Sequence, residues 1–284
     1  MRILSNKKRL LRIISMFLIL LSTVIGGFLG FWITGSVPRN YNVLDPSRKI
    51  ANYTVEQLAE VYKPILYQED NIKPEPTKNF YEIVNKSSSL IIAYRVYWSD
   101  EYYPNAIMDN LYRFFRTIYY GDPADIETIE FEVDIISLKI RQIAFEILKP
   151  GTTEKLPGHR PVRLIFKGPV IYLCYGDTNR TLNFNPFEGT HLVLQVNTWN
   201  HLFSLEETPR GERYDLPLVF MTDKEYMHYK MVRRSAILLK QKEPMQIAII
   251  IIISLIFTIY MGLYFVIFRH EILKKNLLKL IKKT

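Results

Sequence analysis

The sequence predicts a two-pass membrane protein in which two transmembrane α-helices flank a β-rich, sandwich-like extracytoplasmic domain with a few helices. Residues 13–34 and 246–268 contain no charged side chain, and about 20 apolar residues suffice for a helix to cross a bilayer. The region between these runs alternates segments rich in β-branched and aromatic residues with clusters of glycine, proline and asparagine. That pattern is typical of strands separated by turns.

The two tails predict the orientation. Residues 1–12 carry five basic side chains and no acidic one, and residues 269–284 carry six basic side chains and one acidic. Because basic residues are enriched on the cytoplasmic side of membrane helices, both tails are expected in the cytoplasm and residues 35–245 outside it, most simply at the plasma membrane. The net charge of +9 then belongs to the tails, so membrane lipids are expected partners and nucleic acid is not.

The first apolar run is expected to be an uncleaved signal anchor, because the apolar part of a signal peptide is usually only about 7 to 15 residues long. Within it, Gly26 and Gly30 form a G-x-x-x-G pattern, which allows another helix to approach closely. The expected partner is another transmembrane helix, from this chain, from a second copy or from another membrane protein. Glycine is also common in membrane helices that make no such contact.

Residues 35–221 are expected to form one domain that contains two helices as well as strands. Residues 54–62 open with Thr54 and Gln57 in the spacing of a capping box. Residues 104–119 have a proline at their start and Gly121 after their end, and their apolar side chains recur at the spacing of one buried helix face: Ile107, Leu111, Phe114, Phe115 and Ile118. A third helix, over residues 222–245, is expected to lead to the second membrane span from a capping box at Thr222 and Glu225.

Strands are predicted over residues 90–98, 126–136, 140–148, 162–166, 170–175 and 191–198. In the second of these, alternation places Glu130, Glu132 and Asp134 on the solvent face. The single cysteine, Cys174, lies in an apolar strand and is expected to be a buried, inert thiol.

A group of carboxylates at the start of strand 126–136 is the most suggestive candidate site. Asp125 and Glu127 point to the same face of an extended chain, at the mouth of the core side. Two carboxylates held together there repel each other and lose solvation, which a divalent cation relieves, and oxygen ligands favour Ca²⁺ or Mg²⁺. Asp100, Glu101 and Asp122 could complete the site. Alternatively, Asp125 caps a turn and Glu127 pairs with an arginine.

Other chemistries have no support in the sequence. The histidines show no zinc-binding spacing, and there is no G-x-S-x-G motif, no phosphate-binding glycine loop and no reactive-cysteine motif. The sequence therefore favours binding over catalysis.

Four features, in this order, resemble the necrosis-inducing (Nep-like) proteins and the fungal vacuolar-sorting proteins that look related to them. They are Tyr-x-Pro-Ile-Leu-Tyr at 62–67, a strand followed by Asp100, the pattern Gly121-x-x-x-Asp125-x-Glu127, and a late apolar strand with histidine. The hallmark of the family is the heptapeptide G-H-R-H-D-W-E, and its glycine, aspartate and glutamate match here.

The rest of the heptapeptide differs. Asp122 and Ala124 stand in place of the two histidines, and Ile126 stands in place of the tryptophan. The resemblance implies a β-sandwich with a divalent ion at one edge, beside a surface that engages a lipid or glycan head group. By this analogy the ion ligands would include Asp100, Asp125 and Glu127, with His191 or His201 near them. The loss of the two histidines argues against cytolytic activity.

Two functions follow from the sequence. The first is a membrane-anchored domain that recognises, or hydrolyses, a lipid or glycan head group through a divalent metal held by Asp100, Asp122, Asp125 and Glu127. The second is a non-catalytic subunit of a membrane protein assembly that acts through protein–protein contacts.

Overall fold

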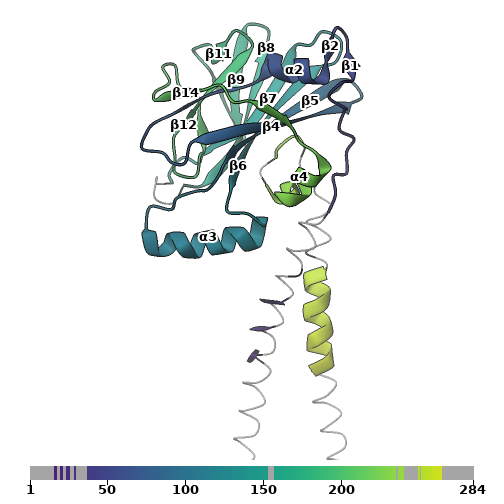
Figure 1. The fold of residues 1–284 in the computed structure, drawn as a ribbon, viewed down its shortest axis with the longest axis vertical. Coiled ribbons are helices and arrows are strands. Elements are labelled where there is room, and N and C mark those ends of the chain that lie inside the picture. The colour runs from purple at the N-terminus through teal and green to yellow at the C-terminus, as the bar shows by residue number, and fades with distance from the viewer. Residues whose placement is uncertain are drawn as a thin grey trace, which may run out of the picture. The chain divides into compact units, whose positions relative to one another are not determined.

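The computed structural model describes residues 16, 17, 20, 21, 24, 25, 29, 37–152, 157–234, 236–239, 249 and 251–263. The chain divides into two compact units, one made of Met1–Val37 with Lys242–Thr284 and the other of Pro38–Gln241. In the first unit, residues 251–263 are helical. All the described strands belong to the second unit (Figure 1).

The prediction of two transmembrane helices is corrected by the structure. In the part of the chain that it describes, no helix combines the length and the apolar character needed to cross a membrane. Four predictions depended on those helices and are wrong: the two-pass fold class, the signal anchor over residues 13–34, partners bound through transmembrane helices, and a plasma-membrane location. Gly26 and Gly30 lie outside the described residues, as does much of 13–34 and of 246–268.

The second unit is the predicted β-rich domain. A two-stranded sheet pairs β1 with β2, and a large branched sheet holds the other strands. The bounds are β1 (Lys49–Ile50), β2 (Tyr53–Thr54), β3 (Ile65–Gln68), β4 (Pro76–Lys86), β5 (Ser89–Trp98), β6 (Asp125–Asp134), β7 (Ile140–Leu148), β8 (His159–Lys167), β9 (Val170–Tyr175), β10 (Thr178–Thr181), β11 (Phe187–Glu188), β12 (His191–Val196), β13 (Phe203–Ser204), β14 (Glu212–Tyr214) and β15 (Leu218–Phe220).

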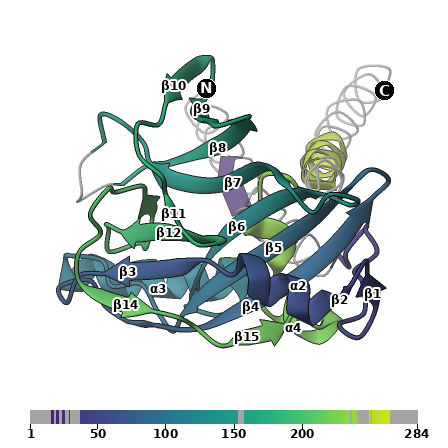
Figure 2. The same ribbon diagram turned by 90° about the horizontal axis from the view of Figure 1, so that it is seen from above.

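The large sheet branches at β7. Strands β15, β4, β5, β6 and β7 are neighbours in that order, and β7 then pairs with both β8 and β13. One branch continues through β8 to β9 and β10, and the other runs through β13 to β12, β3 and β14. Seen from above, β9 and β10 lie at the top of the view and β3, β14 and β15 at the bottom (Figure 2). The branches therefore separate on the two sides of β7.

The main core lies on the face of β5 that carries Leu90, Ile92, Tyr94 and Val96, all fully buried. The opposite face of β5 is buried as well, because Ile91 and Ala93 pack with residues near 239. Burial on both faces explains why this strand reads as an almost continuous apolar run. The core is completed by side chains from β3, β4, β6, β7, β8 and β12.

Three helices accompany the sheet. Helix α2 (Val55–Tyr62) begins at the predicted capping box, with Thr54 and Gln57 each hydrogen-bonded to the backbone of the other. Helix α3 (Ala106–Tyr120) is capped by Asn105 at its N-terminus and by Gly121 at its C-terminus, where the φ of 83° suits glycine. Helix α4 (Asp223–His228) has the predicted capping box but only six residues. A 3₁₀ turn, η1 (Met231–Arg233), follows it, so the helix expected over 222–245 ends at His228.

The predicted buried face of α3 is wrong. Ile107 is 84% exposed, Phe114 59% and Phe115 57%, whereas the buried residue of this helix is Arg116. The 3.6-residue spacing identified the helix but not the face that it buries, because a charged cluster beneath Arg116 decides the orientation.

The six predicted strands are present as β5, β6, β7, β8, β9 and β12. The prediction missed β4, the longest strand, because its sequence PTKNFYEIVNK mixes polar and apolar residues. It also placed Glu130 on the solvent face, whereas Glu130 is fully buried and accepts hydrogen bonds from the backbone N–H groups of Ile237 and Leu239.

Candidate metal centre

A gap between β6 and β7 forms the centre of the candidate site. The two strands pair from Val133↔Ile140 to Glu130↔Ala144, and no pair is formed toward the start of β6. There Ile147 of β7 pairs with Phe203 of β13 instead. The first residues of β6 and the last residues of β7 therefore part where the sheet branches, which leaves room for side chains between them.

Asp125 stands at the start of β6 and is almost fully buried. Its Oδ1 accepts a hydrogen bond from Arg116 Nη2 at 3.1 Å, and its Oδ2 lies 2.8 Å from His201 Nδ1. Burial by itself would raise the pKa of Asp125, but the hydrogen bond from His201 and the charge of Arg116 outweigh it, and the pKa is lowered. Asp125 is therefore an anion whose two oxygens already have partners.

Glu101 shares Arg116 with Asp125. It is buried and forms an ion pair with Arg116 Nη1. Burial, followed by the negative charge of Asp125, raises the pKa of Glu101 to about 8 even though Arg116 acts in the opposite direction. The buried guanidinium of Arg234 also lowers the pKa of Glu101, but burial and the charge of Asp125 outweigh both arginines.

The loop after β12 adds buried polar atoms to this region. The ring of His201 is fully buried and stacks on Trp98 with a centroid distance of 4.5 Å. Within the described part of the chain, His201 Nε2 and Asn200 Oδ1 are buried and have no hydrogen-bond partner. Because such atoms are costly in a folded protein, they are sites where water or a ligand is expected.

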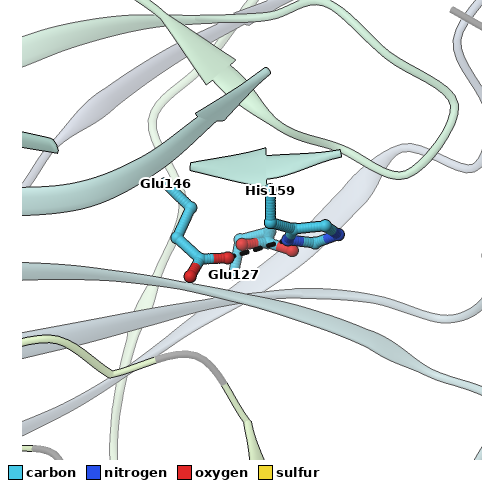
Figure 3. A group of neighbouring side chains, drawn as sticks. All are labelled: Glu127, Glu146 and His159. Carbon is cyan, nitrogen blue, oxygen red and sulfur yellow. Dashed lines mark hydrogen bonds and ion pairs between the residues drawn. The ribbon is translucent and has the colours of Figure 1, made fainter. Parts of the chain in front are cut away.

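The acidic and histidine side chains that meet in the gap are Glu127, Glu146 and His159, from β6, β7 and β8 (Figure 3). One ligand atom from each lies within 4.8 Å of the other two. His159 Nδ1 is 2.7 Å from Glu146 Oε2, and His159 Nε2 is 3.2 Å from the side-chain nitrogen of Asn200. Burial lowers the pKa of His159, but the hydrogen bond and the charge of Glu146 outweigh it, and the pKa is raised.

The other carboxylates predicted as metal ligands are engaged elsewhere. Asp100 forms an ion pair with Arg113. Asp122 Oδ1 accepts a hydrogen bond from the backbone of Ala124 at 2.6 Å, as in a turn. Of the four predicted carboxylates, the structure therefore brings only Glu127 into the group of Figure 3.

The two predicted histidines have different surroundings. His201 contacts Asp125, whereas His191 Nδ1 lies 2.9 Å from the carbonyl oxygen of Lys63. Sequence reasoning missed Glu146 and His159, which face each other across the β7–β8 hairpin. The two strands of that hairpin were predicted over 140–148 and 162–166, so a carboxylate near the end of the first and a histidine three residues before the second were an available signal.

No protein-family model matches the chain, and no curated protein matches it. Similar solved structures do exist. One is NLPPya in complex with mannosamine, with 11% sequence identity and a TM-score of 0.37, covering 76% of this chain and 97% of that one.

NLPPya in complex with glucosamine has 11% identity and a TM-score of 0.36, with 74% of this chain and 95% of that one covered. Necrosis and Ethylene inducing Protein 2 from the causal agent of cocoa's Witches Broom disease has 13% identity and a TM-score of 0.36, with 69% and 84% covered. Necrosis-inducing proteins thus occur among the similar structures, and none of these three is a vacuolar-sorting protein.

Proposed function

We propose that Pro38–Gln241 is a recognition domain that holds one divalent cation between Glu127, Glu146 and His159 and uses that cation to bind the hydroxyl groups of a glycan head group. The observation that carries the proposal is the convergence of three ligand side chains from three strands within 4.8 Å.

The spacing suits a single ion. Metal–ligand bonds of about 2.0 to 2.5 Å place ligands on opposite sides of one ion about 4 to 5 Å apart. A cation would offset the repulsion between the carboxylates of Glu127 and Glu146. Three protein ligands leave coordination positions open, and oxygen atoms of a ligand can fill them.

The ligand types narrow the choice of metal. Carboxylates suit Mg²⁺, Ca²⁺ and Mn²⁺, whereas an imidazole suits Zn²⁺ and other transition metals. A site with two carboxylates and one imidazole favours Mn²⁺ or Zn²⁺ over the Ca²⁺ or Mg²⁺ expected from oxygen ligands alone. If the metal is bound by His159 Nδ1, Nε2 carries the proton, and the side chain of Asn200 beside it would orient the imidazole by accepting that proton through its amide oxygen.

The first experiment is a thermal melt of the full chain with Mn²⁺, Zn²⁺, Ca²⁺, Mg²⁺ or a chelator. An ion present at 100 times its dissociation constant adds about 2.7 kcal/mol, so the melting temperature should rise by several degrees. Glu127→Gln, Glu146→Gln and His159→Gln should each remove the rise. Glu132→Gln is the matched control, because Glu132 lies on the same strand and bonds Ser89 and Gln142 instead.

The rise caused by the ion in each variant is the readout, so a change in the melting temperature of the metal-free variant does not confuse the result. A metal site elsewhere is indicated if the three variants respond as the wild type does. If no ion changes the melting temperature, there is no cation site.

Ligand binding is tested next by calorimetry, with glucosamine and mannosamine as the first probes. Binding should require the ion and should be lost in Glu146→Gln. Sugar binding that persists in chelator would mean that recognition does not use a cation.

A further inference from the structure

A second candidate binding site lies on the opposite side of the β8–β9–β10 branch from the core. It is a groove with a volume of about 600 Å³. Its lining includes Arg163, Ile165, Lys167, Tyr172, Asn179 and Ile237. The three strands that form its floor lie together at the top of Figure 2.

Strand alternation places these side chains together. Val162 and Leu164 of β8 are buried in the core, so Arg163, Ile165 and Lys167 point to the other face. Across the strands, Arg163 is opposite Cys174, which is opposite Asn179. One wall is Ile237, whose backbone N–H is held over the sheet by Glu130 Oε2 at 2.7 Å.

The groove is cationic at two points and apolar between them. Arg163 and Lys167 are four residues apart on one strand, which separates their Cα atoms by about 13 Å. Between them lie Ile165 and the ring of Tyr172, with Lys167 Nζ 5.7 Å from that ring. Among the described residues, no acidic side chain lines the groove, and no ion pair joins either cation to an acid.

The two cations stand on strand β8, which has no free edge. Strand β8 is paired with β7 and β9, and β9 is paired with β8 and β10. A peptide therefore cannot pair with β8 as a further strand, and a ligand between Arg163 and Lys167 must be held by the side chains. Two cations with apolar surface between them complement a molecule with an anionic group at each end and an apolar middle.

We infer that this groove binds an elongated dianion with an apolar middle, of the α,ω-dicarboxylate class. One carboxylate pairs with Arg163 and the other with Lys167, and the chain between them lies on Ile165 and Tyr172. This inference does not depend on the cation centre, which is built from other side chains.

The chain provides its own reporter for the test. Cys174 is the single cysteine, it is half-buried, and it lines the groove. The experiment measures how fast N-ethylmaleimide, a neutral reagent, modifies Cys174 in the full chain at increasing concentrations of decanedioate. Occupancy of the groove should slow the modification.

Arg163→Gln and Lys167→Gln should each raise the decanedioate concentration needed for half-protection about tenfold, the loss of one charge-assisted contact. Both side chains are exposed, so the substitutions do not threaten the fold. Arg180→Gln is the matched control. Arg180 belongs to β10 of the same branch but is opposite Leu173, which faces the core, so its substitution should change nothing.

Two further probes decide whether both cations are used. Decanoate has the same length and one carboxylate, and butanedioate has two carboxylates that cannot reach both cations. The inference is overturned if either probe protects Cys174 as well as decanedioate does, if Arg180→Gln weakens protection as much as Arg163→Gln, or if decanedioate gives no protection.

Discussion

At the scale of single residues, a buried cluster surrounds Glu82. This carboxylate is fully buried and accepts hydrogen bonds from Arg39 at 2.6 Å, from Tyr41 at 2.7 Å and from Arg95. Burial by itself would raise the pKa of Glu82, but the charge of Arg95 and the hydrogen bond from Tyr41 outweigh it, and the pKa is lowered. The carboxylate is thus ionised in the folded protein.

Glu82→Ala should lower the free energy of unfolding by about 3 to 5 kcal/mol, because it leaves two arginines without their buried partner. Urea denaturation measures the loss. Glu188→Ala breaks an exposed pair with Arg213 and should cost at most about 1 kcal/mol. Similar losses in the two variants would contradict this account.

Glu101 predicts a dependence of stability on pH. Its pKa is about 8 in the folded protein against an ordinary value of 4.5, so the folded state holds the proton more tightly than the unfolded state. The stabilisation is complete below about pH 4.5 and is lost as the pH rises through 8.

The free energy of unfolding should therefore be higher at pH 5 than at pH 8, and Glu101→Gln should reduce that difference. Urea titrations at the two pH values measure it. A slope that is unchanged in the variant would assign the effect to another group.

At the scale of elements, the predicted helices α2 and α3 differ in the contacts that attach them to the domain. Helix α2 packs Leu58 and Ala59 fully into the core, whereas α3 leaves its apolar side chains exposed and is attached through Arg116 to Glu101 and Asp125. Both show helical periodicity, so a pattern in the sequence does not distinguish them.

Leu58→Ala should cost about 2 to 5 kcal/mol of unfolding free energy because it leaves a cavity. Phe115→Ala should change it by no more than about 0.5 kcal/mol because its ring is more than half exposed. Chemical denaturation of the two variants compares them. A large loss from Phe115→Ala would show that α3 packs against something in solution.

Glu130 joins β6 to a distant part of the chain. Its carboxylate accepts three backbone hydrogen bonds, from residues 237, 238 and 239. Glu130→Gln has one acceptor oxygen instead of two, so amide hydrogen exchange at residues 237–239 should become faster. Glu132→Gln should leave that exchange unchanged, and mass spectrometry resolves the two outcomes.

At the scale of the whole molecule, the three clusters of buried apolar side chains all lie within Pro38–Gln241. A unit with its own core should fold alone. Residues 38–241, expressed without the rest of the chain, should unfold in a single calorimetric transition near the temperature of the same transition in the full chain. A much lower temperature would mean that the remaining residues contribute to the core.

The sequence by itself determined the elements that depend on local chemistry. The strands with dense β-branched and aromatic residues, the capping box at Thr54 and the glycine after α3 involve neighbours along the chain, so short patterns identify them. Strand β4 was not predicted, because its burial comes from its partners β5 and β15 rather than from its own composition.

Tertiary structure alone decided the rest. The two apolar runs suggested membrane helices, yet the described residues contain no helix that could cross a membrane. Glu127 meets Glu146 and His159 rather than Asp100 and Asp122, because the branching of the sheet at β7 parts β6 from β7 at that point. Likewise, α3 turns its apolar face outward, and the side chain that it buries is Arg116, which pairs with the buried carboxylates of Glu101 and Asp125. Buried charged groups need partners, and these partners come from outside the helix, so the sequence of the helix does not show which face is buried.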